Sequence, residues 1–178
     1  MDHTDTRPAG PAAGGAEHHV TDLYRAHALG LARLALLMLG DPAEAQDIVQ
    51  DAFLGLYRRW GTLASTDAAP GYLRASVLNG CRTALKRRSR VLRPAVFPGG
   101  PEFLESAEAL AIQTEEQRAV LAAVRRLPAR QREALILRYY LDMTEDQAAA
   151  AMRVSRGTVK SATSRAVAAV GRMLKEGS

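Results

Sequence analysis

Apolar residues in this chain recur at the three- and four-residue spacing of an α-helix, and this periodicity constrains the fold more than any other feature. Val20, Leu23, Leu31, Leu34 and Met38 are one example, since all of them fall on one side of a helix. No stretch alternates apolar and polar residues as a half-buried strand would. The apolar set is mostly alanine and leucine, with 5% aromatic residues, which also favours helix over strand. The sequence therefore predicts an all-α protein.

The helical pattern is interrupted in the middle of the chain. Residues 91–113 contain prolines and glycines followed by acidic residues, a composition that predicts a flexible linker. Residues 1–17 are rich in alanine, glycine, proline and histidine without an apolar period, so we expect a disordered tail there. We therefore expect two small helical domains, at residues 18–90 and 114–178, joined by that linker.

Local signals set the boundaries of the expected helices. Gly40 ends the first helix, and Asp41 begins the second, with Glu44 placed to complete a capping box. Thr144 and Ser155 are N-cap residues of the same kind later in the chain. In chain order, the expected helices cover residues 20–39, 42–60, 70–88, 114–127, 129–141, 144–152 and 155–174.

Basic residues gather in two blocks, one in each predicted domain. Residues 71–93 hold seven basic residues and no acid, and residues 125–178 hold eleven basic residues against five acids. Residues 94–124 between them hold five glutamates and one arginine. Two cationic blocks in one short chain predict two contacts with a polyanion such as a nucleic acid.

Residues 144–170 follow the plan of a helix-turn-helix, preceded by a helix whose residues Leu135, Ile136 and Tyr139 we expect to face inward. One side of the last helix is apolar. The other side carries cations and short hydrogen-bonding side chains without an acid, as a helix entering the major groove requires. Its residues are Arg156, Thr158, Lys160, Ser161, Ser164 and Arg165. The pattern alone leaves open an ordinary helical hairpin with a polar face.

Four segments resemble the bacterial RNA polymerase sigma factors, in the order in which that family has them. DPAEAQDIVQDAF at residues 41–53 resembles the segment that binds core polymerase, and PGYLRASVLNGCRTALKRR at residues 70–88 resembles the reader of the promoter −10 element. LPARQREALILRYY, LRYYLDMTEDQAA and GTVKS, within residues 127–161, resemble the −35 reader. No large domain separates the two modules, as in the extracytoplasmic-function branch, and GTVKSATSRA is similar to its SigE-like actinobacterial subgroup.

The resemblance implies a subunit without catalytic activity or cofactor that binds core RNA polymerase through its clamp and flap elements. Such a subunit reads promoter DNA at −10 and −35, helps to open the duplex, and is often held by an anti-sigma protein. The positions implied for polymerase binding are Asp47, Ile48, Gln50, Asp51 and Phe53. Those implied for the −10 element are Tyr72, Arg74, Asn79, Arg82, Lys86, Arg87 and Arg88. Arg138 joins the six polar residues of the last helix at the −35 element.

The chain departs from the family's pattern at several positions. The loop 61–70 matches the base-specificity loop but has no aromatic residue, and Tyr72 stands where tryptophan is usual, so that both a base-contacting and a core role are open for it. Ala148 and Ala162 replace larger side chains. Arg153 stands where a turn glycine is common, at an expected backbone cost of about 1 kcal/mol.

Several other classes of protein fit the sequence poorly. A single cysteine, Cys81, permits neither an intramolecular disulfide nor a cysteine-rich zinc site, and its place in a helix favours a structural role. No apolar stretch is long enough to cross a bilayer, and residues 1–10 have no signal-peptide core, so we expect a cytoplasmic protein without membrane insertion. The histidines at His3, His18 and His19 lack the rigid geometry of a metal site. No motif for catalysis is present.

Two alternatives from other classes compete with a sigma factor. One is a stand-alone helix-turn-helix regulator that binds duplex DNA as a dimer, which would not need the polymerase-binding pattern at residues 41–60. The other is a helical adaptor that binds only proteins, which would not need an acid-free basic face on its last helix. Both features therefore favour the sigma factor.

Overall fold

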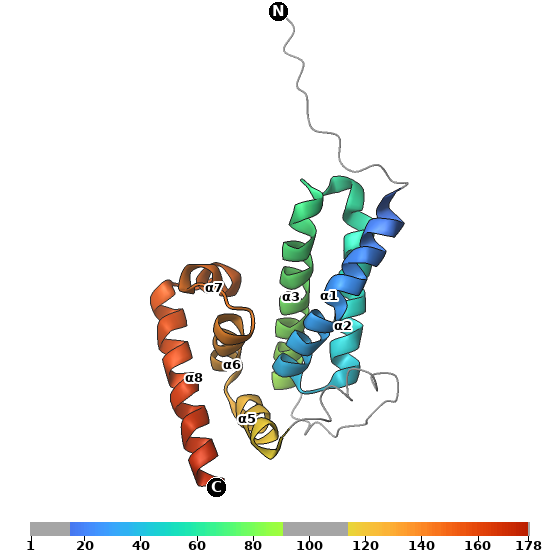
Figure 1. The fold of residues 1–178 in the computed structure, drawn as a ribbon. Coiled ribbons are helices and arrows are strands. Elements are labelled where there is room, and N and C mark those ends of the chain that lie inside the picture. The colour runs from blue at the N-terminus through green and yellow to red at the C-terminus, as the bar shows by residue number, and fades with distance from the viewer. Residues whose placement is uncertain (1–14, 91–113, 178) are drawn as a thin grey trace, which may run out of the picture.

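The computed structural model describes residues 15–90 and 114–177. Within these ranges the chain forms two helical lobes that lie side by side, residues 15–90 as the first lobe and residues 114–177 as the second (Figure 1). The described residues contain no strand, as the periodicity predicts. In the same ranges, no helix is both long and apolar enough to cross a membrane.

The first lobe is a bundle of three helices. They are α1 (Ala16–Leu39), α2 (Pro42–Arg59) and α3 (Ala69–Arg90), and two single 3-10 turns, η2 (Trp60–Thr62) and η3 (Thr66–Ala68), connect the last two. Gly40 ends α1 in the left-handed conformation, with φ of 71°, and its N–H donates to the carbonyl of Leu36. Asp41 then caps α2 by accepting from the backbone N–H of Glu44 at 3.1 Å. The Glu44 side chain pairs with arginines of α3, so only half of the expected capping box forms.

Apolar side chains from all three helices fill the interior of the first lobe. The largest of the fully buried ones are Trp60, Leu34, Met38, Leu56 and Leu73. The helices α2 and α3 approach closely at Gly80, where an added Cβ would lie 2.7 Å from Cγ2 of Ile48. Glycine at this position is therefore a packing requirement, because a larger residue would force the two helices apart.

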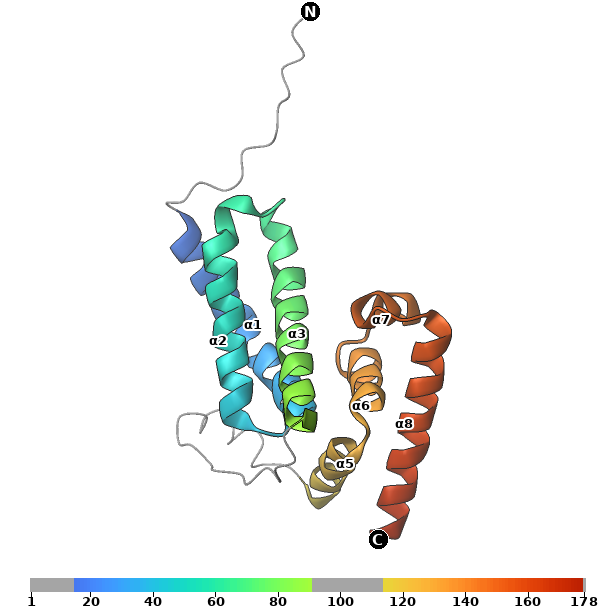
Figure 2. The same cartoon turned by 180° about the vertical axis from the view of Figure 1, so that it is seen from behind.

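The second lobe is built from four helices and one widened turn. They are α5 (Glu115–Arg126), α6 (Ala129–Leu135), the π-helical turn η5 (Ile136–Tyr140), α7 (Glu145–Met152) and α8 (Arg156–Glu176). The long helix α8 runs along α5, α6 and α7, as Figure 2 shows from behind. Val159, Ala162 and Ala166 on its inner side are buried. The apolar stripe predicted for the last helix is thus the side that packs.

The helix-turn-helix forms between α7 and α8 as the sequence predicts. Thr144 and Gln147 make a complete capping box at the start of α7. Ser155 caps α8 by accepting from the N–H of Thr158 at 3.2 Å. Arg153 ends α7 with φ of 54°, the left-handed conformation expected of a residue that replaces a turn glycine.

The structure corrects two local expectations. The first helix begins at Ala16 rather than Val20, because Ala16 is buried and the ring of His19 contacts that of Trp60, with centroids 5.5 Å apart. Tyr139, expected inward, is 70% exposed. The π turn causes this difference, because its extra residue rotates the following side chains around the helix. The tail predicted at 1–17 lies outside the described residues up to residue 14, and so does the linker 91–113.

Candidate nucleic-acid and polymerase interfaces

Four of the predicted −10 residues share one side of α3. Tyr72, Asn79, Arg82 and Lys86 follow each other at spacings of seven, three and four residues, which keeps them within one half of the helix surface. Asn79 and Lys86 are exposed, and Tyr72 is half-buried. The Tyr72 hydroxyl would lie 3.0 Å from a Cβ at Gly55, so the tip of this side chain lies against α2. Tyr72 therefore packs partly against the core of the first lobe, and the rest of its side chain is open to solvent.

The guanidinium of Arg82 is occupied by the second lobe. Its Nε donates to Oε1 of Glu133 at 2.7 Å, and its Nη2 donates to the carbonyl of Ala151 at 2.7 Å and to the same Glu133 oxygen. Its Nη1 donates to Oδ1 of Asn79 at 2.9 Å. All three nitrogens of this predicted DNA contact are therefore engaged within the chain.

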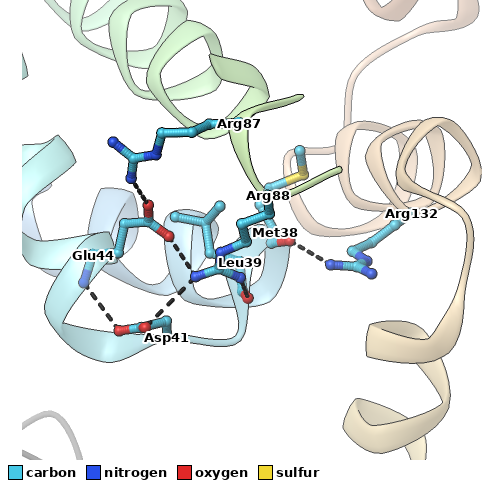
Figure 3. Close-up of polar contacts among 7 residues, drawn as sticks. All are labelled: Met38, Leu39, Asp41, Glu44, Arg87, Arg88 and Arg132. Atoms are coloured by element: carbon cyan, nitrogen blue, oxygen red, sulfur yellow. Dashed lines mark hydrogen bonds and ion pairs between the residues drawn. The ribbon is translucent and has the colours of Figure 1, made fainter. Parts of the chain in front are cut away.

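Two more predicted −10 cations lie in an ion-pair cluster at the end of α3 (Figure 3). Nη2 of Arg87 is 2.6 Å from Oε1 of Glu44, and Arg88 pairs with the other Glu44 oxygen and with Asp41 at 3.6 Å. Nη1 of Arg88 also donates to the carbonyl of Leu39 at 2.8 Å, at the C-terminal end of α1. The sequence predicted these arginines for DNA, and in this structure Arg88 also holds the corner between α1 and α2.

Arg74 and Lys86 differ from these arginines because they form no ion pair with a carboxylate of the described residues. Within the described ranges, no ion pair within 4.0 Å is recorded for either of them. Lys86 is exposed and Arg74 is half-buried. They are therefore the predicted −10 cations whose charge no acid neutralises at short range in this arrangement.

The predicted polymerase-binding residues divide into an exposed and a packed set. Asp47, Gln50 and Asp51 are exposed on α2. Ile48 packs against Gly80, and Phe53 is 6% exposed. The exposed three are thus available to a partner, whereas the last two chiefly hold α2 in the first lobe.

An apolar groove beside these residues was missed by sequence reasoning. It has a volume of about 370 Å³, lies between α1 and α2, and is lined by Gln50, Phe53, Leu54, Tyr57 and Tyr24 among others. Leu54 and Tyr57 are 52% and 50% exposed. The helical spacing of residues 50, 53, 54 and 57 is the signal that could have revealed it.

The outer face of α8 is exposed as predicted, with one residue engaged locally. Lys160, Ser161, Ser164 and Arg165 are exposed. Nε of Arg156 lies 2.7 Å from Oε2 of Glu145, and this hydrogen bond lowers the pKa of the Glu145 carboxyl. Arg156 therefore reaches across the turn to the start of α7. Within residues 15–90 and 114–177, no ion pair involves the other two cations of the face, Lys160 and Arg165.

Two other predicted −35 residues take part in local turns. The Thr158 hydroxyl lies 2.9 Å from that of Ser155, at the cap of α8. Arg138 donates to the carbonyl of Met143, between the π turn and α7. Both positions help to shape the helix-turn-helix, and they therefore support the surface predicted to contact DNA.

A second apolar groove crosses the second lobe and was also missed. Its volume is about 400 Å³, and Val120, Ile136, Tyr139, Tyr140 and Val167 are among its lining residues, together with Leu37 of α1. Tyr139 and Val167 are 70% and 47% exposed. The π turn that turns Tyr139 outward contributes it to this groove.

Cys81 has the structural role favoured by the sequence. It is fully buried in α3, and desolvation, followed by the nearby Glu44 carboxylate, raises the pKa of its thiol to about 12. Arg82, the nearby cation, lowers this pKa by less than burial raises it. A thiol in this state is a packing group rather than a reactive one.

Comparison with known proteins shows what these two lobes resemble. The family model for sigma-70 region 2 matches residues 23–91, and the model for sigma-70 region 4 matches residues 117–170. The RNA polymerase sigma-E factor of Streptomyces coelicolor is 34% identical over 139 residues, which are 78% of this chain and 76% of the relative. The ECF RNA polymerase sigma factor SigM of Mycobacterium tuberculosis is 32% identical over 163 residues, 90% of this chain and 79% of the relative.

Solved structures share the fold. The sigma factor RpoE in complex with the anti-sigma factor NepR from Bartonella quintana aligns with a TM-score of 0.65 and 22% identity, over 89% of this chain and 96% of that one. CnrH in complex with the cytosolic domain of CnrY aligns with a TM-score of 0.64 and 23% identity, over 93% of this chain and 94% of that one. At these identities the likeness concerns the arrangement of helices.

Proposed function

This chain belongs to the sigma-70 family of RNA polymerase sigma factors, in its extracytoplasmic-function branch, and from that premise we propose how its two lobes divide the work. The observation that carries the proposal is the match of regions 2 and 4, in order, to the two lobes. Family membership supports a subunit that directs polymerase to promoters over the stand-alone regulator. The protein acts where core polymerase is, in the cytoplasm.

The exposed side of α2 binds the clamp helices of core polymerase in this proposal. Asp47, Gln50 and Asp51 supply carboxylate and amide groups, and the adjoining groove offers Leu54 and Tyr57 as apolar contacts. A mixture of exposed apolar side chains and satisfiable polar groups is typical of an interface that forms and dissociates. Phe53 and Ile48 act through the packing of α2.

The first lobe also reads the −10 element. Lys86, Arg74 and, when released from Glu133, Arg82 supply cations along the DNA backbone. Tyr72 and Asn79 lie on the same side of α3, where an aromatic edge and an amide can contact unpaired bases. Residues 61–70, which lead from the end of α2 into the first turn of α3, supply the specificity loop in this proposal.

The second lobe reads the −35 element through α8. The N-terminus of α8 presents backbone N–H groups to phosphate, and Lys160, Ser161 and Arg165 stand on its exposed side. The apolar groove around Tyr139 and Val167 suits the flap element of polymerase. Because two solved relatives were captured with an anti-sigma factor or a cytosolic binding domain, we also propose an anti-sigma partner for this chain.

In vitro transcription with bacterial core polymerase and a pool of genomic promoter fragments tests this function. We expect transcripts with discrete start sites that depend on the protein and are lost with the double variant Asp47→Ala/Gln50→Ala. The matched control is Glu116→Ala/Glu176→Ala, which changes two exposed residues of the second lobe and leaves initiation intact. No transcripts, together with duplex binding by the protein alone, would instead establish the stand-alone regulator.

A further inference from the structure

The two lobes meet along a seam of specific polar contacts. Arg82 of α3 binds Glu133 of α6 and the carbonyl of Ala151 in α7. Arg132 of α6 donates to the carbonyl of Met38 at the end of α1 (Figure 3). The hydroxyl of Tyr140 donates to the carbonyl of Gly30 at 3.3 Å. The seam therefore joins α1 and α3 of the first lobe to three elements of the second.

Buried apolar side chains continue across the same seam. Ile136, Leu137 and Met143 of the second lobe belong to one contiguous cluster with the core of the first lobe. Leu37 of α1 lines the groove of the second lobe. Apolar burial that spans two domains favours the closed arrangement, because opening the seam exposes this surface to water.

Among the residues that the structure describes, Glu133 is the most completely buried charged side chain. It is 7% exposed, and its recorded ion pair is with Arg82. A buried carboxylate is costly without a counter-ion, so in the closed arrangement Glu133 depends on the arginine of the other lobe. The pairing makes the closed arrangement specific, because another docking angle would leave this charge unpaired.

We propose that the two lobes form an intramolecular closed state in which Glu133 and the Ala151 carbonyl hold Arg82 away from promoter DNA. The inference rests on the proposed function for the role of Arg82 at the −10 element, whereas the closed state itself rests on the seam alone. Glu133 takes the place that a phosphate would take on the guanidinium, since both anions accept charge-assisted hydrogen bonds. DNA, or polymerase acting on the lobes, must therefore open the seam before Arg82 can bind.

The closed state lowers the apparent DNA affinity in proportion to its population. When only a fraction of molecules is competent, the apparent dissociation constant is the intrinsic one divided by that fraction. A variant that opens the seam is then expected to bind DNA about three to ten times more tightly, if the open fraction of the wild type is about a tenth to a third. This gain distinguishes a seam that blocks binding from one that merely joins the lobes.

Charge exchange across the seam tests the closed state without DNA or polymerase. Spin labels on cysteines at Ala75 in α3 and Ala150 in α7, both exposed, report the distance between the lobes, while native Cys81 is buried and does not label. We expect a narrow main distance with a minor longer component in the wild type. A longer and broader distance should dominate in Arg82→Glu and in Glu133→Arg, and the narrow main distance should return in the double exchange. A label pair at Ala150 and Arg172 within the second lobe verifies that each variant is folded.

A distance that is broad in the wild type, or unchanged by the single exchanges, would overturn the proposal. The double exchange separates ion pairing from loss of folding, because a variant that fails to fold does not recover when a second charge is reversed. These outcomes are independent of the proposed function, which is tested by transcription.

DNA binding by the full chain then tests the blocking of Arg82. The probe is a fluorescein-labelled single-stranded oligonucleotide of random sequence, and the variant is Glu133→Gln, with its lobe distance measured in parallel. We expect Glu133→Gln to bind the oligonucleotide about three to ten times more tightly than the wild type does. Glu116→Gln, at an exposed acid of the same lobe, controls for the removal of one negative charge. Equal affinities of the two variants, with the seam open in Glu133→Gln, would overturn the blocking role.

Discussion

Arg132 of the second lobe donates a hydrogen bond to the main-chain carbonyl of Met38, at the C-terminal end of α1 in the first lobe (Figure 3). Its other terminal nitrogen, Nη2, donates to the carbonyls of Arg125 and Leu127. One guanidinium therefore satisfies the end of α1 and the bend between α5 and α6 together. Burial and the nearby Arg125 and Arg88 lower the pKa of Arg132, and these carbonyls offset that cost in part.

Replacement of Arg132 by alanine is expected to destabilise the protein by about 1–3 kcal/mol, because partly buried carbonyls lose a charged donor. Urea denaturation of the full chain measures the loss. Arg130→Ala, at an exposed position two residues away, is the matched control and should change stability by less than about 0.5 kcal/mol. Equal effects of the two substitutions would contradict the assigned contact.

Two glycines of the same helix are expected to respond in opposite directions to alanine. At Gly80 an added Cβ meets Ile48 at 2.7 Å, so Gly80→Ala should cost about 1–3 kcal/mol through overpacking. At Gly71 an added Cβ meets nothing within 4 Å, so Gly71→Ala should stabilise the protein by about 0.5–1 kcal/mol through helix propensity. Thermal denaturation distinguishes the two, and a stabilising Gly80→Ala would show that the contact of α2 with α3 is looser.

The thiol of Cys81 predicts how stability depends on alkaline pH. Its pKa is about 12 in the folded chain against 9.0 for a thiol exposed to water, so above pH 9 the unfolded state releases this proton first. The stabilising effect is therefore complete below pH 9 and is lost as pH rises toward 12. We expect the free energy of unfolding to fall more steeply between pH 8.5 and 10.5 in the wild type than in Cys81→Ala, by up to about 1.4 kcal/mol per pH unit. Parallel profiles would refute the raised pKa.

Ser155 allows the fold of α8 to be separated from its DNA contact. Ser155→Ala removes the cap that accepts from Thr158 and should cost about 1 kcal/mol of stability. Ser155→Asp keeps a capping oxygen but places a negative charge at the end of α8 that we propose to face phosphate. We expect Ser155→Asp to match the wild type in urea denaturation and to bind promoter duplex more weakly. If it binds as tightly as the wild type, the N-terminus of α8 is not at the DNA backbone.

Local signals predicted most element boundaries, because each depends on residues close in sequence. Gly40, Asp41, Thr144 and Ser155 act on the backbone within one turn, so their caps appear in the structure where the sequence places them. The start of the first helix, at Ala16 instead of Val20, and the outward position of Tyr139 are the exceptions. A π turn depends on how neighbouring helices pack, and the local pattern of apolar residues does not contain that information.

The sequence predicted which single residues of the candidate site are exposed. It did not predict which residues of the site contact each other. Lys160 and Arg165 could be placed on the outer face of a helix from spacing alone, and both are exposed. The pairing of Arg82 with Glu133 joins residues 51 positions apart, across residues 91–113, and no local pattern encodes it. The two apolar grooves likewise combine side chains from different helices.

The sequence by itself determined that the chain is helical, where most of its helices begin and end, and which polar residues lie on the outer faces of α2 and α8. The spacing of apolar residues, the helix caps and the distribution of charge can all be read from neighbouring residues. The resemblance of four segments, in the same order as in sigma factors, indicated the family. The tertiary structure decided which cations are free. Arg82, Arg87 and Arg88 are identical in chemical type to Arg74, yet the first three meet carboxylates brought by distant segments. A charge is available only where folding leaves no opposite charge beside it, because ion pairing acts through space and not along the chain.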